Sequence, residues 1–438
     1  MPQHRLSARG QWVLSRLRGR RSLLKSFFGR FGAALAYRDF RNLWTANAFA
    51  QAAAWGLIVT RGWLIYHETG SSFLVGVATF AALGPQFIVP PIIGVLADRM
   101  DRRKILSWTY GVNTAQTGVL AVLALLGGLE IWMLIALGVV NGVARSAQMP
   151  VSQAMSASLV PKEKLLNALS LQASTQHGSR LIGPGFVTPL IALSGAPAAF
   201  LVCALFYLVG WYKVLQITPR PPEGSITEGF FANFVGGLTY VYSRPVLRFM
   251  LILVFMHCGL TMAFESLLPT FSAQRLGAAD EGFGTLIMGV GAGAFVASIF
   301  VSGIQTTKAR GNALISMGIL SGLGQVLLSL TTSLVVATGA AMLMGGAQAA
   351  FMTMGQAVTQ SIASDEYRGR VASINAFSLG GIMATMNLMN GTLADEVGAQ
   401  TLLFTHGFIF VSIMVVSLFM FTGRRVYGRV PALEAQPA

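Results

Sequence analysis

The chain has 438 residues, of which 54% are hydrophobic and only 11% are charged, whereas roughly 25% of the residues of a soluble domain are charged. This composition excludes a water-soluble globular protein and, because the chain is so apolar, a disordered one. The 31 basic and 16 acidic residues give a net charge of +15, but too little polar sequence remains to build a nucleic-acid-binding surface. We therefore expect a polytopic membrane protein.

The membrane-spanning helices can be predicted from long stretches with few or no charges, since a helix needs about 20 apolar residues to cross the hydrocarbon core. Dividing these stretches at glycines, prolines and polar turns predicts twelve transmembrane helices in an all-α fold. They cover residues 41–66, 72–94, 104–127, 131–157, 167–193, 197–216, 246–269, 282–303, 312–331, 333–358, 371–394 and 400–422.

The polar segments between these helices divide the chain into five parts. The sequence that begins at Pro161, before the fifth helix, weakly resembles the one that begins at Ser364, before the eleventh, at an offset of 203 residues. A duplication of six helices would explain this repeat. The predicted parts are a basic N-terminal tail (1–40), a six-helix bundle (41–217), a connector with an amphipathic helix (218–245), a second six-helix bundle (246–423) and a C-terminal tail (424–438).

The distribution of basic residues predicts the orientation of the chain. Of the 31 basic residues, 27 lie on the side that carries both termini, whereas the opposite side has Arg275 among several acidic residues. Loops rich in lysine and arginine stay in the cytoplasm. We expect both termini to be cytoplasmic and the protein to lie in the cell membrane, that is, the inner membrane of a bacterium.

The loop after the second predicted helix carries a family resemblance. It reads Gly94-Val-Leu-Ala-Asp98-Arg99-Met-Asp101-Arg102-Arg103-Lys104, which closely resembles the signature loop of the major facilitator superfamily. Asp101 stands where that signature has its second glycine, a departure that resembles the branch of siderophore and drug exporters. The resemblance implies two pseudo-symmetric six-helix bundles and transport by alternating access.

The same loop is predicted to act as a cytoplasmic gate. An unpaired carboxylate at the end of a membrane helix is costly, so Asp98 needs donors, which Arg368, Arg370 or the start of the eleventh helix can supply. Such a contact would hold the two halves together on the cytoplasmic side. Anchoring to lipid headgroups is the alternative role for the basic residues that follow Asp101. The predicted gate consists of Gly94, Asp98, Arg99, Arg102, Arg103, Arg368 and Arg370.

Four charged residues lie in the interior of predicted helices, outside their first three and last four residues: Arg61, Arg145, Arg180 and Glu265. Each costs at least ~2.5–3.5 kcal/mol at the bilayer centre, so each is a candidate functional residue unless it reaches the interface by snorkelling. We expect Arg145, Arg180 and His257 to line a central cavity whose net positive charge favours an anionic substrate. For His257, hydrogen-bonded packing without a role in binding is the alternative.

Arg61 and Glu265 are predicted to form an extracellular gate. They lie 204 residues apart, almost the repeat offset, and so occupy nearly equivalent places in the outer thirds of the first and seventh helices. A pair offsets much of the cost of two isolated buried charges. We expect the pair to form when the outer mouth is shut and to break when Glu265 takes up a proton. Two independent snorkelling side chains are the alternative.

Neither an enzyme nor an ATP-driven pump is expected. The chain contains no GxxxxGK(S/T), HExxH or CxxC motif, so no nucleotide, metal or other cofactor is predicted. The prediction is a secondary active transporter, a monomer that exports a small amphipathic or anionic compound such as a siderophore or drug against inward proton flow. Its partners would be this small molecule, membrane lipid and protons, and no nucleic acid. A lipid or lysolipid transporter or flippase is the alternative, and a non-transporting membrane sensor or enzyme is less favoured.

Overall fold

The computed structural model describes residues 33–219, 230–301, 304, 306–364 and 367–427 of the chain. Within these ranges the regular elements are helices, and no strand occurs. Most of the two predicted tails (residues 1–32 and 428–438) and part of the predicted connector (220–229) lie outside the described residues.

The first half of the chain builds one group of helices. They are α2 (Arg38–Thr69), α3 (Ser72–Leu83), α4 (Pro85–Arg99), α5 (Arg102–Leu125), α6 (Ile131–Leu159), α7 (Lys162–Ser194) and α8 (Ala196–Leu215), and a short 3-10 turn, η1 (Ala33–Ala36), precedes them. The predicted helix 72–94 is divided at Gly84 into α3 and α4. Pro85 begins α4, a position where its missing N–H interrupts no helical hydrogen bond.

The second half builds the other group. Its elements are α9 (Phe230–Ser243), α10 (Pro245–His257), a π-helical turn η2 (Cys258–Met262), α11 (Leu268–Gln274), α12 (Gly282–Val301), α13 (Thr307–Leu330), α14 (Leu334–Ile362), α15 (Arg368–Val397), α16 (Ala399–Phe419) and α17 (Phe421–Val426). The prediction of one continuous helix over 246–269 is wrong. The chain instead forms α10, turns through η2, leaves the helical conformation and resumes as α11.

The helices are suited to a membrane. Eight of the described helical segments are long and apolar enough to cross one. Helices α2, α5, α7 and α15 have 32, 24, 33 and 30 residues and lie where spans were predicted, but they are less apolar. The prediction of an all-α polytopic membrane protein is confirmed, and the count of twelve spans stays a prediction.

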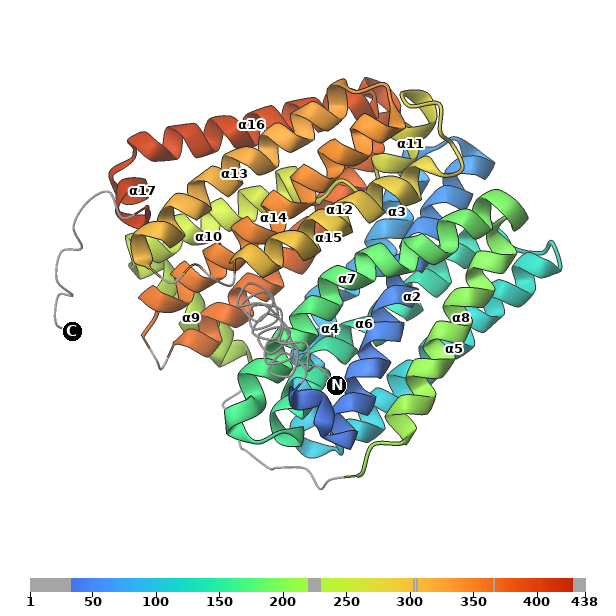
Figure 1. Cartoon of the computed structure of the whole chain (residues 1–438), viewed down its shortest axis with the longest axis horizontal. Coiled ribbons are helices and arrows are strands. Elements are labelled where there is room, and N and C mark those ends of the chain that lie inside the picture. The colour runs from blue at the N-terminus through green and yellow to red at the C-terminus, as the bar shows by residue number, and fades with distance from the viewer. Residues whose placement is uncertain (1–32, 220–229, 302–303, 305, 365–366, 428–438) are drawn as a thin grey trace, which may run out of the picture.

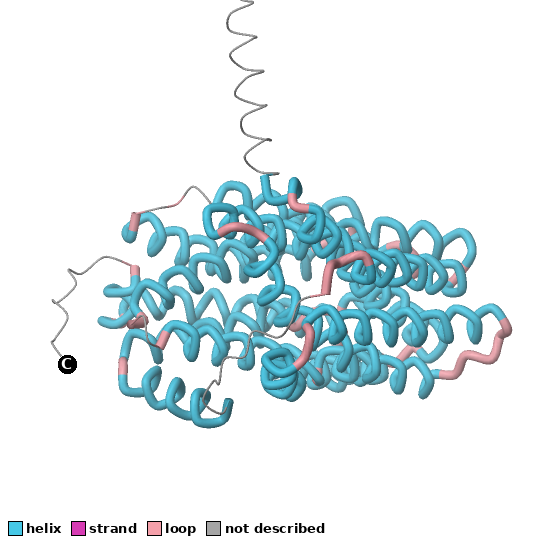
Figure 2. The backbone as a smooth tube through the Cα atoms, turned by 90° about the horizontal axis from the view of Figure 1, so that it is seen from below, coloured by secondary structure: helices cyan, strands magenta, loops and turns pink. Residues whose placement is uncertain are grey.

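The two groups of helices lie against each other along two seams. Figure 1 shows the first half in blue to green and the second in yellow-green to red, with α7 beside α12 and α3 beside α15. Figure 2 shows the helices aligned lengthwise and joined by short loops. Glycines allow close contact at both seams: a Cβ on Gly391 would lie 2.8 Å from the Cα of Gly76, and one on Gly291 would lie 2.7 Å from the Cβ of Arg180.

At the end predicted to face outward, a carboxylate from the second half holds the start of α3. Asp395 Oδ1 accepts from the backbone N–H of Ser72 at 2.8 Å, and its Oδ2 accepts from the N–H of Phe73 and the hydroxyl of Ser71, both at 3.1 Å. The Ser72 and Thr270 hydroxyls form a further hydrogen bond of 2.6 Å. We call these contacts the outer clasp.

The charge of Asp395 contributes to the outer clasp. Partial burial raises the pKa of this carboxyl, but the hydrogen bonds from Phe73, Ser72 and Ser71 lower it more, so that its pKa lies below the ordinary value. A group whose pKa is lowered by its contacts stabilises them while it is ionised. The contribution is complete above the ordinary pKa of an aspartate, roughly 4, and is lost as the pH falls through the lowered value.

We expect Asp395→Asn to open the outer end more often. An amide accepts hydrogen bonds less strongly than a carboxylate, and the loss is about 1 kcal/mol for such a solvent-exposed group, or about a fivefold rise in the open population. Electron-spin distance measurements between labels at Phe73→Cys and Val397→Cys would report this population, and acidifying the wild type through the lowered pKa should have the same effect.

The matched control is Glu396→Gln, which removes the exposed carboxylate next to Asp395. Its distance distribution should remain that of the wild type. If Asp395→Asn and Glu396→Gln gave the same distribution, the clasp would not stabilise the closed outer end.

Candidate functional site

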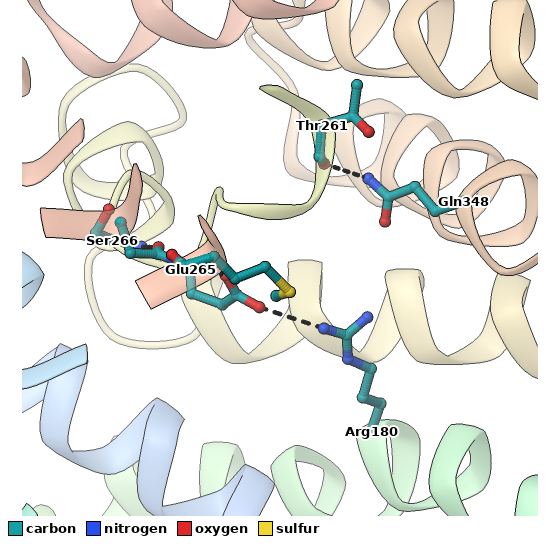
Figure 3. Close-up of polar contacts among 7 residues, drawn as sticks. Arg180, Thr261, Glu265, Ser266 and Gln348 are labelled. Carbon is teal, nitrogen blue, oxygen red and sulfur yellow. Dashed lines mark hydrogen bonds and ion pairs between the residues drawn. The ribbon is translucent and has the colours of Figure 1, made fainter. Parts of the chain in front are cut away.

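A buried ion pair joins the two halves of the protein. Arg180 on α7 donates through Nη2 to Glu265 Oε1 at 3.2 Å, and the two side chains are 11% and 2% exposed. Figure 3 shows the pair meeting across the space between the halves. Burying one of these charges alone would cost free energy, and each member of the pair offsets part of the cost of burying the other.

Glu265 lies on the non-helical segment between η2 and α11, and the carbonyls of η2 and of this segment need partners. Side-chain amides from three helices supply them: Gln325 donates to the carbonyl of Leu260 at 3.1 Å, Gln348 to that of Thr261, and Asn390 to that of Ala263 at 2.6 Å. Figure 3 shows the contact of Gln348. Backbone that leaves the helical conformation within a membrane persists only where the protein satisfies it in this way.

Asn387 fixes the Glu265 carboxylate from the other side. Its NH2 group donates to Glu265 Oε2 at 3.1 Å, and its Oδ1 accepts from the backbone N–H of Ser266 at 2.9 Å. Both carboxylate oxygens therefore have a donor, a cation on one and a neutral amide on the other. The amide would remain a suitable partner after protonation, whereas the attraction to Arg180 would be lost.

Arg145 and Arg180 come together at one aromatic ring. The guanidinium carbon of Arg180 lies 4.0 Å from the ring centre of Trp55, and that of Arg145 lies 5.8 Å from it, both within the range of a cation–π contact. The Trp55 indole N–H is buried without a hydrogen-bond acceptor. The structure thus brings the two predicted arginines together beside Glu265 and adds Trp55, which sequence reasoning missed.

The predicted Arg61–Glu265 pair is wrong in this structure. Arg61 donates instead to Gln116 Oε1 at 3.1 Å and to Asn141 Oδ1 at 3.5 Å, inside the N-terminal bundle. Equivalent positions in a repeat fix the depth of two residues but not the direction of their side chains. Glu265 also lies outside regular helix, so its direction does not follow helical periodicity.

The expectation that His257 lines a central cavity is also corrected. Its side chain is fully buried, its Nε2 lies 3.2 Å from Ser321 Oγ, and its ring packs against Phe351 and Phe410 at 4.2 and 5.0 Å. The histidine therefore lies in the core of the C-terminal bundle, which is the packing role that the sequence left open.

Part of the predicted cytoplasmic gate can be located. Asp101 caps α5 by accepting from the N–H of Arg103 at 2.9 Å, and the side chain of Arg103 donates to the carbonyl of Leu215 at 2.6 Å. Arg102 donates to the carbonyl of Ala154 at 3.5 Å. These contacts tie the loop to its own half. Arg370 stacks over the ring of Tyr367 at 5.0 Å. The surroundings of Gly94 and the side chains of Asp98, Arg99 and Arg368 are not among the described parts of the structure.

An all-helical fold of two bundles of apolar helices, with a buried ion pair between them, places the protein in the class of polytopic α-helical membrane proteins. The family described as transmembrane secretion effectors matches residues 31–427 of the chain. The chain belongs to this family of the major facilitator superfamily, as the loop motif predicted.

Relatives and solved structures agree with this assignment. The chain is 22% identical to macrolide efflux protein A of Streptococcus pyogenes, over 86% of this chain and 94% of the relative. It is also 22% identical to the multidrug efflux pump Tap of Mycolicibacterium fortuitum, over 83% and 91% of the two chains. A crystal structure of the human organic anion transporter MFSD10 has the same fold, with a TM-score of 0.63, 16% identity and coverage of 86% and 98%.

A shorter match connects the chain with siderophore export. The enterobactin exporter EntS of Shigella boydii is 24% identical over 41% of this chain and 43% of its own length. The predicted resemblance to the siderophore and drug exporters of the superfamily is therefore confirmed.

We expect removal of one member of the ion pair to destabilise the protein strongly. Arg180→Gln should cost about 3–5 kcal/mol, because it leaves a buried carboxylate without its cation, and Arg180→Gln with Glu265→Gln together should cost clearly less than the sum of the two single changes. Thermal unfolding of the purified variants in detergent would measure both effects. Arg145→Gln is the matched control, since Arg145 faces the same ring without an ion pair. Additive losses would contradict a stabilising pair.

Proposed function

We propose that this protein is a proton-coupled exporter that works by alternating access, as a monomer in the cell membrane with both termini in the cytoplasm. The substrate would be a small amphipathic or anionic compound of the drug or siderophore kind. The Arg180–Glu265 pair carries the proposal, because it places a titratable group at the contact between the halves. The names of the relatives, which include macrolide, multidrug and enterobactin exporters, support the direction of transport.

The pair can couple a proton to a change of conformation. While Glu265 is ionised, its attraction to Arg180 holds the non-helical segment of the second half against α7 of the first. A proton neutralises the carboxylate and leaves Arg180 as an uncompensated buried cation. The cation then favours a conformation in which it contacts water or an anionic group of the substrate. The Glu265 carboxylate and an anionic group of the substrate therefore compete for one arginine, and protonation of Glu265 shifts this competition toward the substrate.

Arg145 and Trp55 extend this site toward the substrate. Arg145 is half-buried and has no hydrogen-bond or ion-pair partner in the described part of the chain, and the Trp55 ring offers an apolar surface between the two arginines. A ligand with a flat apolar part and an anionic group matches this combination of aromatic ring and cation. We propose that Arg145 and Arg180 contact the anionic part.

The lipid-transporter alternative is not favoured. It requires a lateral opening between the halves, whereas both seams are closely packed in the described structure, through Gly76 and Gly391 at one and Gly291 at the other. The names of the relatives cited above refer to drugs and siderophores.

The proposed coupling predicts the behaviour of Glu265→Gln. In proteoliposomes that enclose a pH-sensitive dye, an acidic lumen should drive uptake of a macrolide or enterobactin by the wild type and should speed the loss of luminal protons. Glu265→Gln should reduce this gradient-driven uptake about tenfold or more, equivalent to a coupling free energy of ~1.4 kcal/mol or more. Uptake that does not depend on the gradient would contradict proton coupling, and wild-type activity of Glu265→Gln would exclude this residue as its carrier.

We also propose that the loop of residues 94–104 gates the cytoplasmic side through Asp98. Asp98→Asn should lower transport about tenfold while the protein stays folded, because the amide would lose a charge-assisted contact of about 1.5 kcal/mol. Lys104→Gln, an exposed position of the same loop, is the control and should transport normally. Wild-type turnover of Asp98→Asn in the same proteoliposomes would contradict the gate.

A further inference from the structure

Arg61 lies inside the N-terminal bundle with only neutral partners. Its hydrogen bonds go to Gln116 of α5 and Asn141 of α6, and no carboxylate pairs with it among the described residues. The arginine is 4% exposed. Because an arginine keeps its proton in a protein, α2 carries an uncompensated positive charge within the membrane, which is costly.

The rules of hydrogen bonding fix the orientation of the amides beside this charge. Arg61 can only donate, so Asn141 must turn its carbonyl oxygen toward Arg61 and its NH2 group away. That NH2 group donates to Asn113 Oδ1 at 2.9 Å and to the hydroxyl of Tyr207 at 3.2 Å. The NH2 group of Asn113 then points away from Asn141 and has no acceptor.

Donors without an acceptor occur in the same hydrogen-bond network as this cation, which links Arg61 through Asn141 to Asn113 and Tyr207. In the described part of the chain, Arg61 Nε, Asn113 Nδ2 and the proton of the Tyr207 hydroxyl lack an acceptor. Asn113 and Tyr207 are 0% exposed, so bulk water does not reach them. Buried polar groups almost always have partners. The side-chain oxygens of Gln116, Asn141 and Asn113 already accept hydrogen bonds, so they cannot serve the free donors. Free donors near an uncompensated cation are the surroundings that an anion requires.

Gly138 leaves room for no more than a methyl-sized group next to the guanidinium. It lies one turn before Asn141 on α6, and a Cβ at this position would be 3.9 Å from Arg61 Nη1, with no other atom closer than 3.6 Å. The surrounding side chains are closed to solvent, since Gln116 and Asn141 are 4% and 3% exposed. Only a small ion, and not an amphipathic substrate, suits such an enclosed position.

We propose that Arg61, Asn113 and Tyr207 form an anion site within the N-terminal bundle, which holds chloride or another small monovalent anion as a resident counter-ion. The ion accepts from the guanidinium, the amide and the hydroxyl and neutralises the buried charge. The site is separate from the Arg180–Glu265 pair and depends on neither the substrate nor the direction of transport. A water molecule could accept from the same donors, but it would leave the charge uncompensated.

The test is thermal unfolding of the purified full-length protein in detergent, with sodium gluconate replaced stepwise by sodium chloride at constant ionic strength. An anion that binds only the folded state raises Tm as its concentration rises. We expect a saturable increase of about 2–4 °C with chloride and with bromide, and none with gluconate or sulfate, which are too large for the enclosed site. Scintillation-proximity binding of radioactive chloride to the same protein should saturate over the same range.

Variants separate this site from general salt effects. Arg61→Gln removes the charge that needs an anion and should abolish the chloride response. Asn113→Asp supplies a built-in counter-ion, so its Tm in gluconate should equal its Tm in chloride. Arg275→Gln, which removes an exposed positive charge on another part of the chain, should respond as the wild type does.

Two results would overturn the proposal. One is a wild-type Tm that is the same in chloride and gluconate, which would leave the network occupied by water. The other is a wild-type response in Asn113→Asp, which would indicate an adventitious ion only. Asn113→Asp keeps the test decisive if Arg61→Gln does not fold.

Discussion

Within a membrane, every charge and every free backbone carbonyl must find its partner in the protein, because lipid offers none. The non-helical segment between η2 and α11 depends most on this constraint. An amide side chain from α15 satisfies a carbonyl of this segment, and amides from α13 and α14 satisfy two carbonyls of η2, which precedes it. Glu265 is therefore positioned by the packing of the whole C-terminal bundle and not by its own helix. A carboxylate held in this way can face the other half of the molecule without the freedom to turn elsewhere.

Arg180 and Arg61, two buried arginines, find partners for their charge in different ways. Arg180 is compensated by a carboxylate from the opposite half, whereas Arg61 is surrounded by neutral groups of its own half. An ion pair between two bodies changes when the bodies move, so it can respond to a conformational equilibrium and can bias it. A network inside one bundle moves with that bundle and remains the same in every state. Arg180 is thus suited to coupling, and Arg61 to maintaining the structure of the N-terminal half.

Much of the fold could be predicted because long apolar stretches are bounded by charged loops: the predicted helix 282–303 agrees with α12. The break in the predicted helix 246–269 could not be predicted, since that segment is mostly apolar without a glycine–proline or polar turn, and its amide partners lie 65 to 127 residues away in the sequence. Buried charge indicated Arg180 and Glu265 as site residues, but the repeat assigned the wrong arginine to the carboxylate. Trp55 had no distinguishing signal, because a tryptophan in an apolar helix usually only packs.

Helix α15 connects the buried ion pair with the outer end of the molecule. Asn387 holds the Glu265 carboxylate, and the backbone carbonyl of the same residue lies 3.0 Å from where a Cβ of Gly76 on α3 would be. Eight residues further along, about 12 Å in a helix, Asp395 holds the start of α3. Asn387 and Asp395, both on α15, therefore both contact α3 of the other half. Under the proposed proton coupling, a shift of Asn387 that follows the loss of charge on Glu265 would move Asp395 with it, so the outer clasp would respond to the protonation of Glu265 through α15.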